Sequence, residues 1–203
     1  MYDFVFHKHL RLVLDAMLLF VVGLFVSWPV VHYRLHSVAR LPLAVFRAIL
    51  HVMGRSPSLL RMSGVIFSFN SLVMFLYMAA GFHPLLPMVL GICTGMNIGI
   101  IMGLGKRERE TVAAMRPGPG QWIPRPELAA VCAPAVLLIE LPCFWLSIAM
   151  GISMGHAVQS GASTYLAALA VRSEAYVSVV LPLLLVSAVA ETVAVRGAAA
   201  DGE

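Results

Sequence analysis

Charged residues are scarce in this sequence. Asp, Glu, Lys and Arg make up 12% of the 203 residues, whereas hydrophobic residues make up 60%. A soluble domain averages about 25% charged residues, so this composition excludes an ordinary soluble domain and is typical of an integral membrane protein. The formal net charge of +4 would suggest nucleic acid in a soluble protein, but membrane proteins carry such arginines in cytoplasmic loops. We therefore expect the lipid bilayer, and no nucleic acid, as a partner.

Catalytic and metal-binding patterns are also missing from the sequence. Cys93, Cys132 and Cys143 lie in apolar runs without CxxC spacing, which excludes a disulfide framework and a zinc site of the usual kind. No two of the seven histidines lie in the middle of two apolar runs, so a bis-histidine haem is not expected. A single histidine that holds a pigment within a larger complex stays open. No serine lies in a histidine-carboxylate pattern, and no phosphate loop is present. We expect a non-enzymatic protein without cofactor or metal.

Five apolar runs are long enough to cross a bilayer, which takes about 20 residues. They occupy residues 10–31, 62–80, 85–104, 128–150 and 174–195. Between the first two runs, apolar residues recur at helical spacing among arginines, which predicts an interfacial amphipathic helix over 41–53 with Pro42 in its first turn. Residues 105–127 are polar and predict a cytoplasmic loop, and the weakly polar residues 153–173 are compatible with a second interfacial segment. The predicted fold is a single all-α domain, a polytopic membrane helix bundle.

Basic residues are distributed unevenly around these five spans. One side of the membrane receives eleven of the fourteen Lys and Arg residues, and the other side receives three. Because cytoplasmic loops carry the excess of Lys and Arg, this distribution predicts an outside amino terminus and a cytoplasmic carboxyl terminus. The first run does not follow the pattern of a cleaved signal peptide, so we expect it to be retained as a span.

Four polar side chains interrupt the apolar runs and form the candidate site. They are Asn70, Asn97, Glu140 and Glu191. A carboxylate at membrane depth costs several kcal/mol unless it finds a partner, a proton or water. One interpretation is a proton or cation site built from oxygen ligands and carboxylates. The other is that each side chain closes a hydrogen bond between packed helices. Both interpretations stay open.

Glycine and proline spacing predicts how the spans pack. Glycine recurs every fourth residue in the third run, at Gly91, Gly95, Gly99 and Gly103. This spacing places the four residues on one helix face, where the backbone of another helix can come close. Pro134 and Pro142 lie inside the fourth run, and Pro87 interrupts the third. Since proline removes a backbone donor, we expect kinked or broken helices in these two spans.

Four segments together resemble a known family. They are FSFNSLVMFLYMAAG, MVLGICTGMNIGIIMGLG, LLIELPCFWLSIAMGISMG and LPLLLVSAVAETVAV. Their order and content are similar to the stage II sporulation protein M family of bacterial and archaeal membrane proteins, over roughly residues 66–194. The resemblance implies a multi-pass protein of a bacterial or archaeal cytoplasmic membrane. It also implies that the four residues of the candidate site are the intramembrane polar residues of the family.

The sequence departs from the family pattern in one place. The family commonly has a histidine-glycine pair shortly before the glutamate, and this chain has Ala135-Val136-Leu137 there, so it resembles a divergent member. The resemblance implies a non-catalytic scaffold or subunit of a membrane complex. We expect such a protein to assemble with itself or with membrane-protein partners through the glycine face. The alternative is a permease-like unit that moves a proton, an ion or a small solute past Glu140 and Glu191.

Overall fold

The computed structural model of the chain describes residues 2–54, 56–113 and 122–200, and every regular element in these ranges is helical. The elements are α1 (Tyr2–His32), α2 (His36–Met53), α3 (Leu59–Ala79), α4 (Leu85–Leu104), α5 (Lys106–Ala113), α6 (Pro126–Gln159), α7 (Tyr165–Ala175), the π-helical segment η1 (Tyr176–Val180) and α8 (Leu181–Ala200). The predicted all-α class is confirmed.

Five helical stretches among the described residues are long and apolar enough to cross a membrane. They are Leu10–His32, Leu59–Ala79, Leu85–Leu104, Glu127–Gln159 and Tyr165–Gly197. Large apolar side chains lie exposed on their outer faces, and the exposed fraction reaches 74% for Phe25 and 76% for Leu138. Exposure of such large apolar surfaces to water is unfavourable, so the outer faces suit contact with acyl chains. The chain is a multi-pass membrane protein.

Local sequence signals explain several helix ends. The side-chain hydroxyl of Ser58 accepts a hydrogen bond from the Arg61 amide at the start of α3, and Thr164 caps α7 in the same way. Both satisfy a backbone donor that the first turn leaves without an intrahelical partner. Pro126 begins α6, where the missing N–H of proline costs nothing. Gly54 follows α2 with a φ of 81°, a backbone conformation that favours glycine.

The helices differ from the predicted segments in three places. Residues 153–173 form no separate interfacial segment, because α6 continues to Gln159 and α7 leads directly into the last span. Helix α2 begins at His36, so Pro42 lies inside the helix and not in its first turn. Of the predicted loop 105–127, residues 106–113 form α5, and residues 114–121 lie outside the described residues.

The third and fourth spans, predicted to be kinked or broken, each form one continuous helix. Pro87 is the third residue of α4, and the first turn has free amides in any case, so a proline there removes no helical hydrogen bond. Helix α6 continues through both Pro134 and Pro142. The irregular turn lies instead in the last span, where η1 joins α7 to α8. A π-helical turn inserts an extra residue and shifts the faces of the helix that follows.

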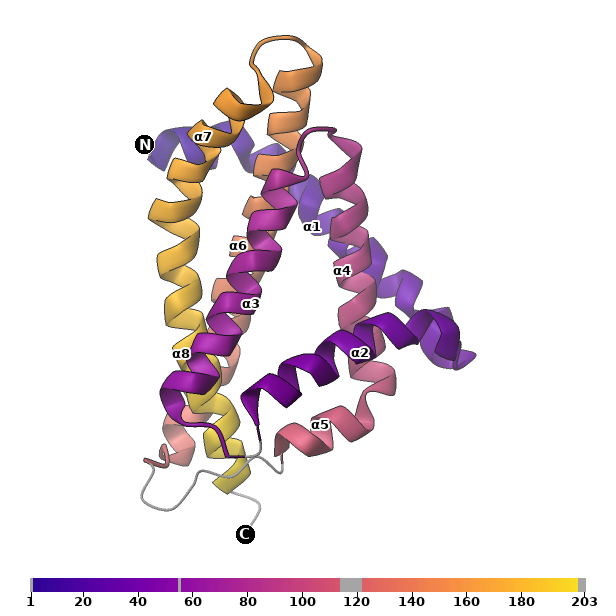
Figure 1. The fold of residues 1–203 in the computed structure, drawn as a ribbon, viewed down its shortest axis with the longest axis vertical. Coiled ribbons are helices and arrows are strands. Elements are labelled where there is room, and N and C mark those ends of the chain that lie inside the picture. The colour runs from indigo at the N-terminus through magenta and orange to yellow at the C-terminus, as the bar shows by residue number, and fades with distance from the viewer. Residues whose placement is uncertain (1, 55, 114–121, 201–203) are drawn as a thin grey trace.

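Figure 1 shows how the helices are arranged. The carboxyl end of the chain lies with α2 and α5 at one end of the bundle, and α7 lies with the turn between α3 and α4 at the other end. Helices α3 and α4 are close together at this turn and diverge toward the opposite end, where α2 runs across from one to the other (Figure 1). The amphipathic helix thus lies across two of the spans.

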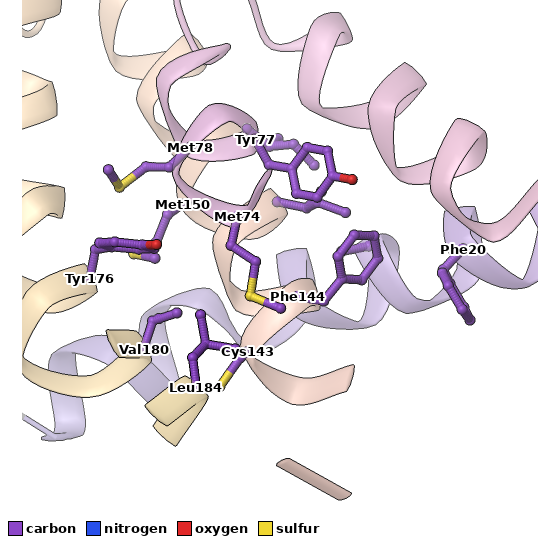
Figure 2. Packing of buried hydrophobic residues seen from close by; sticks show 13 residues of the cluster. Phe20, Met74, Tyr77, Met78, Cys143, Phe144, Met150, Tyr176, Val180 and Leu184 are labelled. Atoms are coloured by element: carbon purple, nitrogen blue, oxygen red, sulfur yellow. The ribbon is translucent and has the colours of Figure 1, made fainter. Parts of the chain in front are cut away.

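The main core forms where α3, α6 and the last span meet. In Figure 2, Met74 and Met78 of α3 face Cys143 and Met150 of α6, with Val180 of η1 beside them. Flexible methionines fill irregular gaps between helices well. Aromatic rings extend this core toward α1, and these rings also border the cavity described below.

Helices α1 and α4 make the closest backbone contact. A Cβ atom added to Gly95 of α4 would overlap the carbonyl oxygen of Phe20, and one added to Gly23 of α1 would overlap the carbonyl oxygen of Ile92. Gly99 and Gly103 face Ser27 and Val31 of α1, and Gly91 faces Ile148 of α6 and Leu19 of α1. The predicted glycine face therefore packs inside the chain, mainly against α1.

Candidate functional site

The polar residues at the middle of the spans meet across three helices. Asn70 lies in α3, Asn97 in α4 and Glu140 in α6. The Nδ2 atom of Asn70 donates a hydrogen bond of 2.7 Å to Oε1 of Glu140. A hydrogen bond between spans offsets part of the cost of holding both groups inside a membrane. This pair connects α3 with α6 near the middle of both helices.

These three residues line one cavity of about 460 Å³. Its polar lining consists of Asn70, Tyr77, Thr94, Asn97 and Glu140. The remaining lining side chains are apolar and come from α1, α2, α3, α4 and α6. Its volume lies within the range of about 300–1,000 Å³ that is usual for small-molecule sites, which are mostly apolar with a few placed polar groups. The arrangement is that of a binding cavity at membrane depth.

Aromatic rings form one wall of this cavity. The ring of Phe144 lies 5.2 Å from that of Tyr77 and 5.5 Å from that of Phe20, measured between centroids, and both pairs meet edge to face. Figure 2 shows Phe144 between Tyr77 of α3 and Phe20 of α1. Edge-to-face pairs of this kind add to the stability gained from burial. The wall is therefore fixed by contacts that join three helices.

Two polar residues of the site were not predicted from the sequence. The hydroxyls of Tyr77 and Thr94 are 2.5 Å apart, and Thr94 also lies 3.0 Å from the Leu90 carbonyl oxygen. Helical spacing provided a signal, because Tyr77 lies seven residues after Asn70 and Thr94 lies three residues before Asn97. Residues at these separations share a helix face. The two hydroxyls thus extend the polar lining across α3 and α4.

Helix α2 was also missed as part of the site. Its apolar stripe was expected to rest on lipid, but much of it lines the cavity: Leu41, Pro42, Val45, Phe46 and Ile49. Arg40, Arg47 and His51 of the same helix lie exposed. The helix is amphipathic as predicted, with its apolar face directed partly at the protein interior.

The fourth predicted site residue, Glu191, lies outside the cavity lining. It is half-buried in α8 and close enough to Glu140 for the two carboxyl groups to interact electrostatically. No hydrogen bond links Glu191 to any described residue. Ser187, one turn earlier in α8, is fully buried with its hydroxyl near the Glu140 carboxyl, but the hydroxyl lies within normal hydrogen-bonding geometry of no described residue. The cavity lining therefore includes three of the four predicted residues, and Glu191 lies outside it in α8.

The predicted kink prolines lie beside the site without lining it. Pro134 and Pro142 are both exposed on α6. Pro142 follows Glu140 by two residues and cannot donate to the carbonyl four residues before it. Leu141, which lies between Glu140 and Pro142 in the sequence, does line the cavity.

A buried arginine holds the end of the bundle near α2. Arg196 of α8 is only 3% exposed, and its guanidinium donates to the carbonyl oxygens of Trp122 and Pro57 at 3.2 and 2.5 Å. These carbonyls lie in segments just before α6 and α3. Sequence reasoning counted Arg196 only as a basic residue of the tail, because no local pattern marks an arginine that pairs with distant backbone oxygens.

The donor set favours hydrogen bonding over metal binding. The described lining offers one carboxylate and two amides, whereas a bound Ca²⁺ takes six to eight oxygen ligands and Mg²⁺ needs a near-octahedral set. The second carboxylate oxygen of Glu140 accepts no hydrogen bond from the described residues, and Asn97 makes none to them. A small molecule with a hydrogen-bond donor is therefore the kind of ligand that these groups suit.

Comparisons with known proteins place the chain in a family. Neither the curated proteins nor the solved structures gave a match. A family model described as Stage II sporulation protein M matches residues 16–195. The match covers most of the chain, overlaps all five spans, and includes Asn70, Asn97, Glu140, Glu191 and the four glycines of α4. The chain belongs to the stage II sporulation protein M family.

Proposed function

We propose that the chain is a non-enzymatic, permease-like membrane protein that takes up a small solute or proton in the cavity at Asn70, Asn97 and Glu140. One observation supports this proposal above the others: three polar residues from three spans line a single cavity at mid-depth. Buried polar groups inside a membrane are costly and commonly belong to pathways for protons or solutes. Glu140 is the main acceptor, and Asn97 is a second contact.

Glu191 continues this polar set toward the end of the bundle that holds α2. It lies in α8, five residues before the buried Arg196, and interacts electrostatically with Glu140. In this proposal Glu191 does not touch the solute. It lies on the route by which a proton or solute leaves the cavity.

The scaffold function is the second candidate. Its expected contact surface was the glycine face, which α1 of the same chain covers, so that face has no room for a second copy or another partner. A scaffold would have to use the exposed apolar faces, and acyl chains cover these equally well. For this reason the cavity has more weight in the proposal than any partner surface.

We further propose that the amino terminus lies outside a bacterial or archaeal cytoplasmic membrane and the carboxyl terminus inside. The positively charged segments support this orientation, because α2, α5 and the carboxyl end share one end of the bundle (Figure 1). The test is labelling of single cysteines in a variant without the three native ones. An impermeant reagent should label intact cells at position 83, in the α3–α4 turn, and not at position 118. The reverse pattern would contradict the orientation.

The function is tested in vesicles that contain the purified protein. Proton flux is followed with a trapped pH-sensitive dye, and solute uptake with labelled methylammonium. We expect flux of one or both above that of empty vesicles, with a return to the empty level for Glu140→Gln. Val52→Leu, at an exposed position of α2 away from the cavity, serves as the matched control. Flux equal to that of empty vesicles, or unchanged flux in Glu140→Gln, would refute the proposal.

A further inference from the structure

We infer that the cavity takes its ligand from the bilayer, through an opening between α2 and α4, and that the ligand is a lipophilic amine with a protonated head and an apolar tail. This inference rests on the proposed function, because it concerns the same cavity. It adds the class of ligand and the route of entry.

The opening is marked by residues that line the cavity and are also exposed. The exposed fractions are 73% for Leu41 and 40% for Val45, both in α2, and 36% for Ile98 in α4. Residues that meet both conditions lie between the cavity and the outer surface, and they mark the place where we infer the opening. All three side chains are apolar, so the opening suits acyl chains better than water. The two helices that carry these residues, α2 and α4, lie next to each other at one end of the bundle (Figure 1).

The interior favours a cationic head. None of the described residues that line the cavity is basic, and the acidic side chain among them is that of Glu140. Among the described residues, Asn70 is the one in normal hydrogen-bonding geometry with this carboxyl, although the Ser187 hydroxyl lies near it, and the side-chain amide of Asn97 makes no hydrogen bond to them. An ammonium group has donors for both. The aromatic wall formed by Phe20, Tyr77 and Phe144 adds rings whose faces attract cations.

The apolar part of the lining favours a tail. Phe46, Ile49 and Ile101 lie in the same two helices as the three residues of the opening and also line the cavity. A small hydrophilic cation would leave this surface without a contact. An alkyl tail that extends from Glu140 past α2 would cover it and continue into the bilayer. The polar and apolar parts of one cavity thus match the two parts of one amphiphile.

Trp145 provides a reporter for the test. Its ring lies 6.4 Å from that of Phe20, which lines the cavity. A variant with Trp28→Phe and Trp122→Phe keeps Trp145 as the single tryptophan. In nanodiscs, its fluorescence is quenched by a bromine atom that enters the cavity. The probes are dodecylamine and dodecanol, each brominated at the same carbon near the head, and dodecane brominated at the corresponding carbon of the chain.

We expect saturable quenching by the brominated amine at concentrations at least tenfold lower than for the alcohol or the alkane. Glu140→Gln should raise the concentration of the brominated amine that is needed for the same quenching about tenfold. Leu41→Phe with Val45→Phe narrows the opening and should slow or abolish quenching. Val52→Phe, on the same helix and 54% exposed but outside the lining, should leave it unchanged. Phenylalanine does not absorb at the wavelength that excites tryptophan.

Several outcomes would overturn the inference. Equal quenching by all three probes would mean simple partitioning into the lipid. Quenching by the alcohol as strong as by the amine would exclude a charged head, and an unaffected opening variant would exclude the lateral route. If methylammonium flux depends on Glu140 but the brominated amine does not bind, the inference fails and the proposed function stands. If both assays are negative, both fail.

Discussion

The two faces of α4 differ sharply, and the difference shows how this bundle is built. On one face, glycines bring the backbone of α4 against that of α1, so that a single added carbon at Gly95 would overlap a carbonyl oxygen. On another face, Thr94, Asn97 and Ile98 border an open cavity. Small residues fix the helix on one side. Because glycines hold α4 tightly against α1, the opposite part of α4 need not pack closely, and its polar side chains can border a cavity.

The diverging helices α3 and α4 extend the same comparison. A short turn joins them, and the two helices diverge from it (Figure 1). Residues of both helices and of α2 line the cavity. An amphipathic helix of this kind is usually read as lying in the interface plane. Here it also supplies the apolar wall of a site, so its sequence serves both the membrane surface and the cavity.

The largest expected effect comes from breaking the sealed face. Gly95→Leu should prevent α1 and α4 from approaching, because its first side-chain carbon meets backbone atoms of Phe20 that cannot move alone. Overpacking of a core costs about 1–3 kcal/mol and more where backbone must shift, so we expect little folded protein. Yield and the midpoint of thermal unfolding in detergent measure the effect.

The control for this variant is Gly64→Leu in α3. A carbon added at Gly64 meets nothing within 4 Å, and leucine favours a helix more than glycine does. We expect an unchanged or slightly higher unfolding midpoint. Equal losses in the two variants would mean that the contact between α1 and α4 is not specially tight.

The next effect concerns the end of the bundle that holds α2. Arg196→Ala removes two hydrogen bonds from a charged group to the carbonyls of Trp122 and Pro57. Hydrogen bonds to charged groups are worth about 1.5–3 kcal/mol each, so we expect a loss of at least about 2 kcal/mol in the free energy of unfolding. Arg40→Ala, at an exposed position of α2, should change it little. Similar values for both variants would contradict the role of Arg196 as an anchor.

A smaller effect is expected at the polar lining of the cavity. Asn70→Ala removes the 2.7 Å bond to Glu140, and hydrogen bonds between spans contribute about 1 kcal/mol. Asn97→Ala removes an amide that bonds to no described residue and should leave the unfolding free energy nearly unchanged. Under the proposed function both variants lower flux. A stability loss for Asn97→Ala as large as for Asn70→Ala would show that its amide has a partner.

Much of the fold could be predicted from the sequence, because membrane spans are set by length and hydrophobicity alone. The polar positions were also visible, since Asn70, Asn97 and Glu140 stand out in apolar runs. Which of them meet depends on how the helices are oriented relative to one another, and no local pattern determines that. Glu191 is as conspicuous in the sequence as Glu140, yet it lies in a helix that does not border the cavity.

The glycine face shows a further limit of sequence reasoning. Four glycines in register predict a close helix contact, but they do not say whether the partner helix belongs to the same chain. Gly23 in α1 was the missing signal, because it lies against α4 from the other side. A lone glycine in an apolar run carries little information until the two helices are placed together. For the same reason the role of α2 in the cavity could not be predicted.

The smallest expected effect tests whether the buried hydroxyls of α3 and α8 that lie outside the cavity lining have hydrogen-bond partners. Ser187 and Ser63 are both buried, but the Ser63 hydroxyl donates to Thr192 at 3.0 Å, whereas that of Ser187 has no partner among the described residues. Ser63→Ala should therefore cost about 1 kcal/mol, and Ser187→Ala should be neutral or slightly stabilising, because an unpaired buried hydroxyl is itself a cost. Chemical denaturation in detergent compares the two. An equal loss for Ser187→Ala would mean that its hydroxyl bonds to Glu140 in the folded protein, and the polar set would then extend from the cavity into α8.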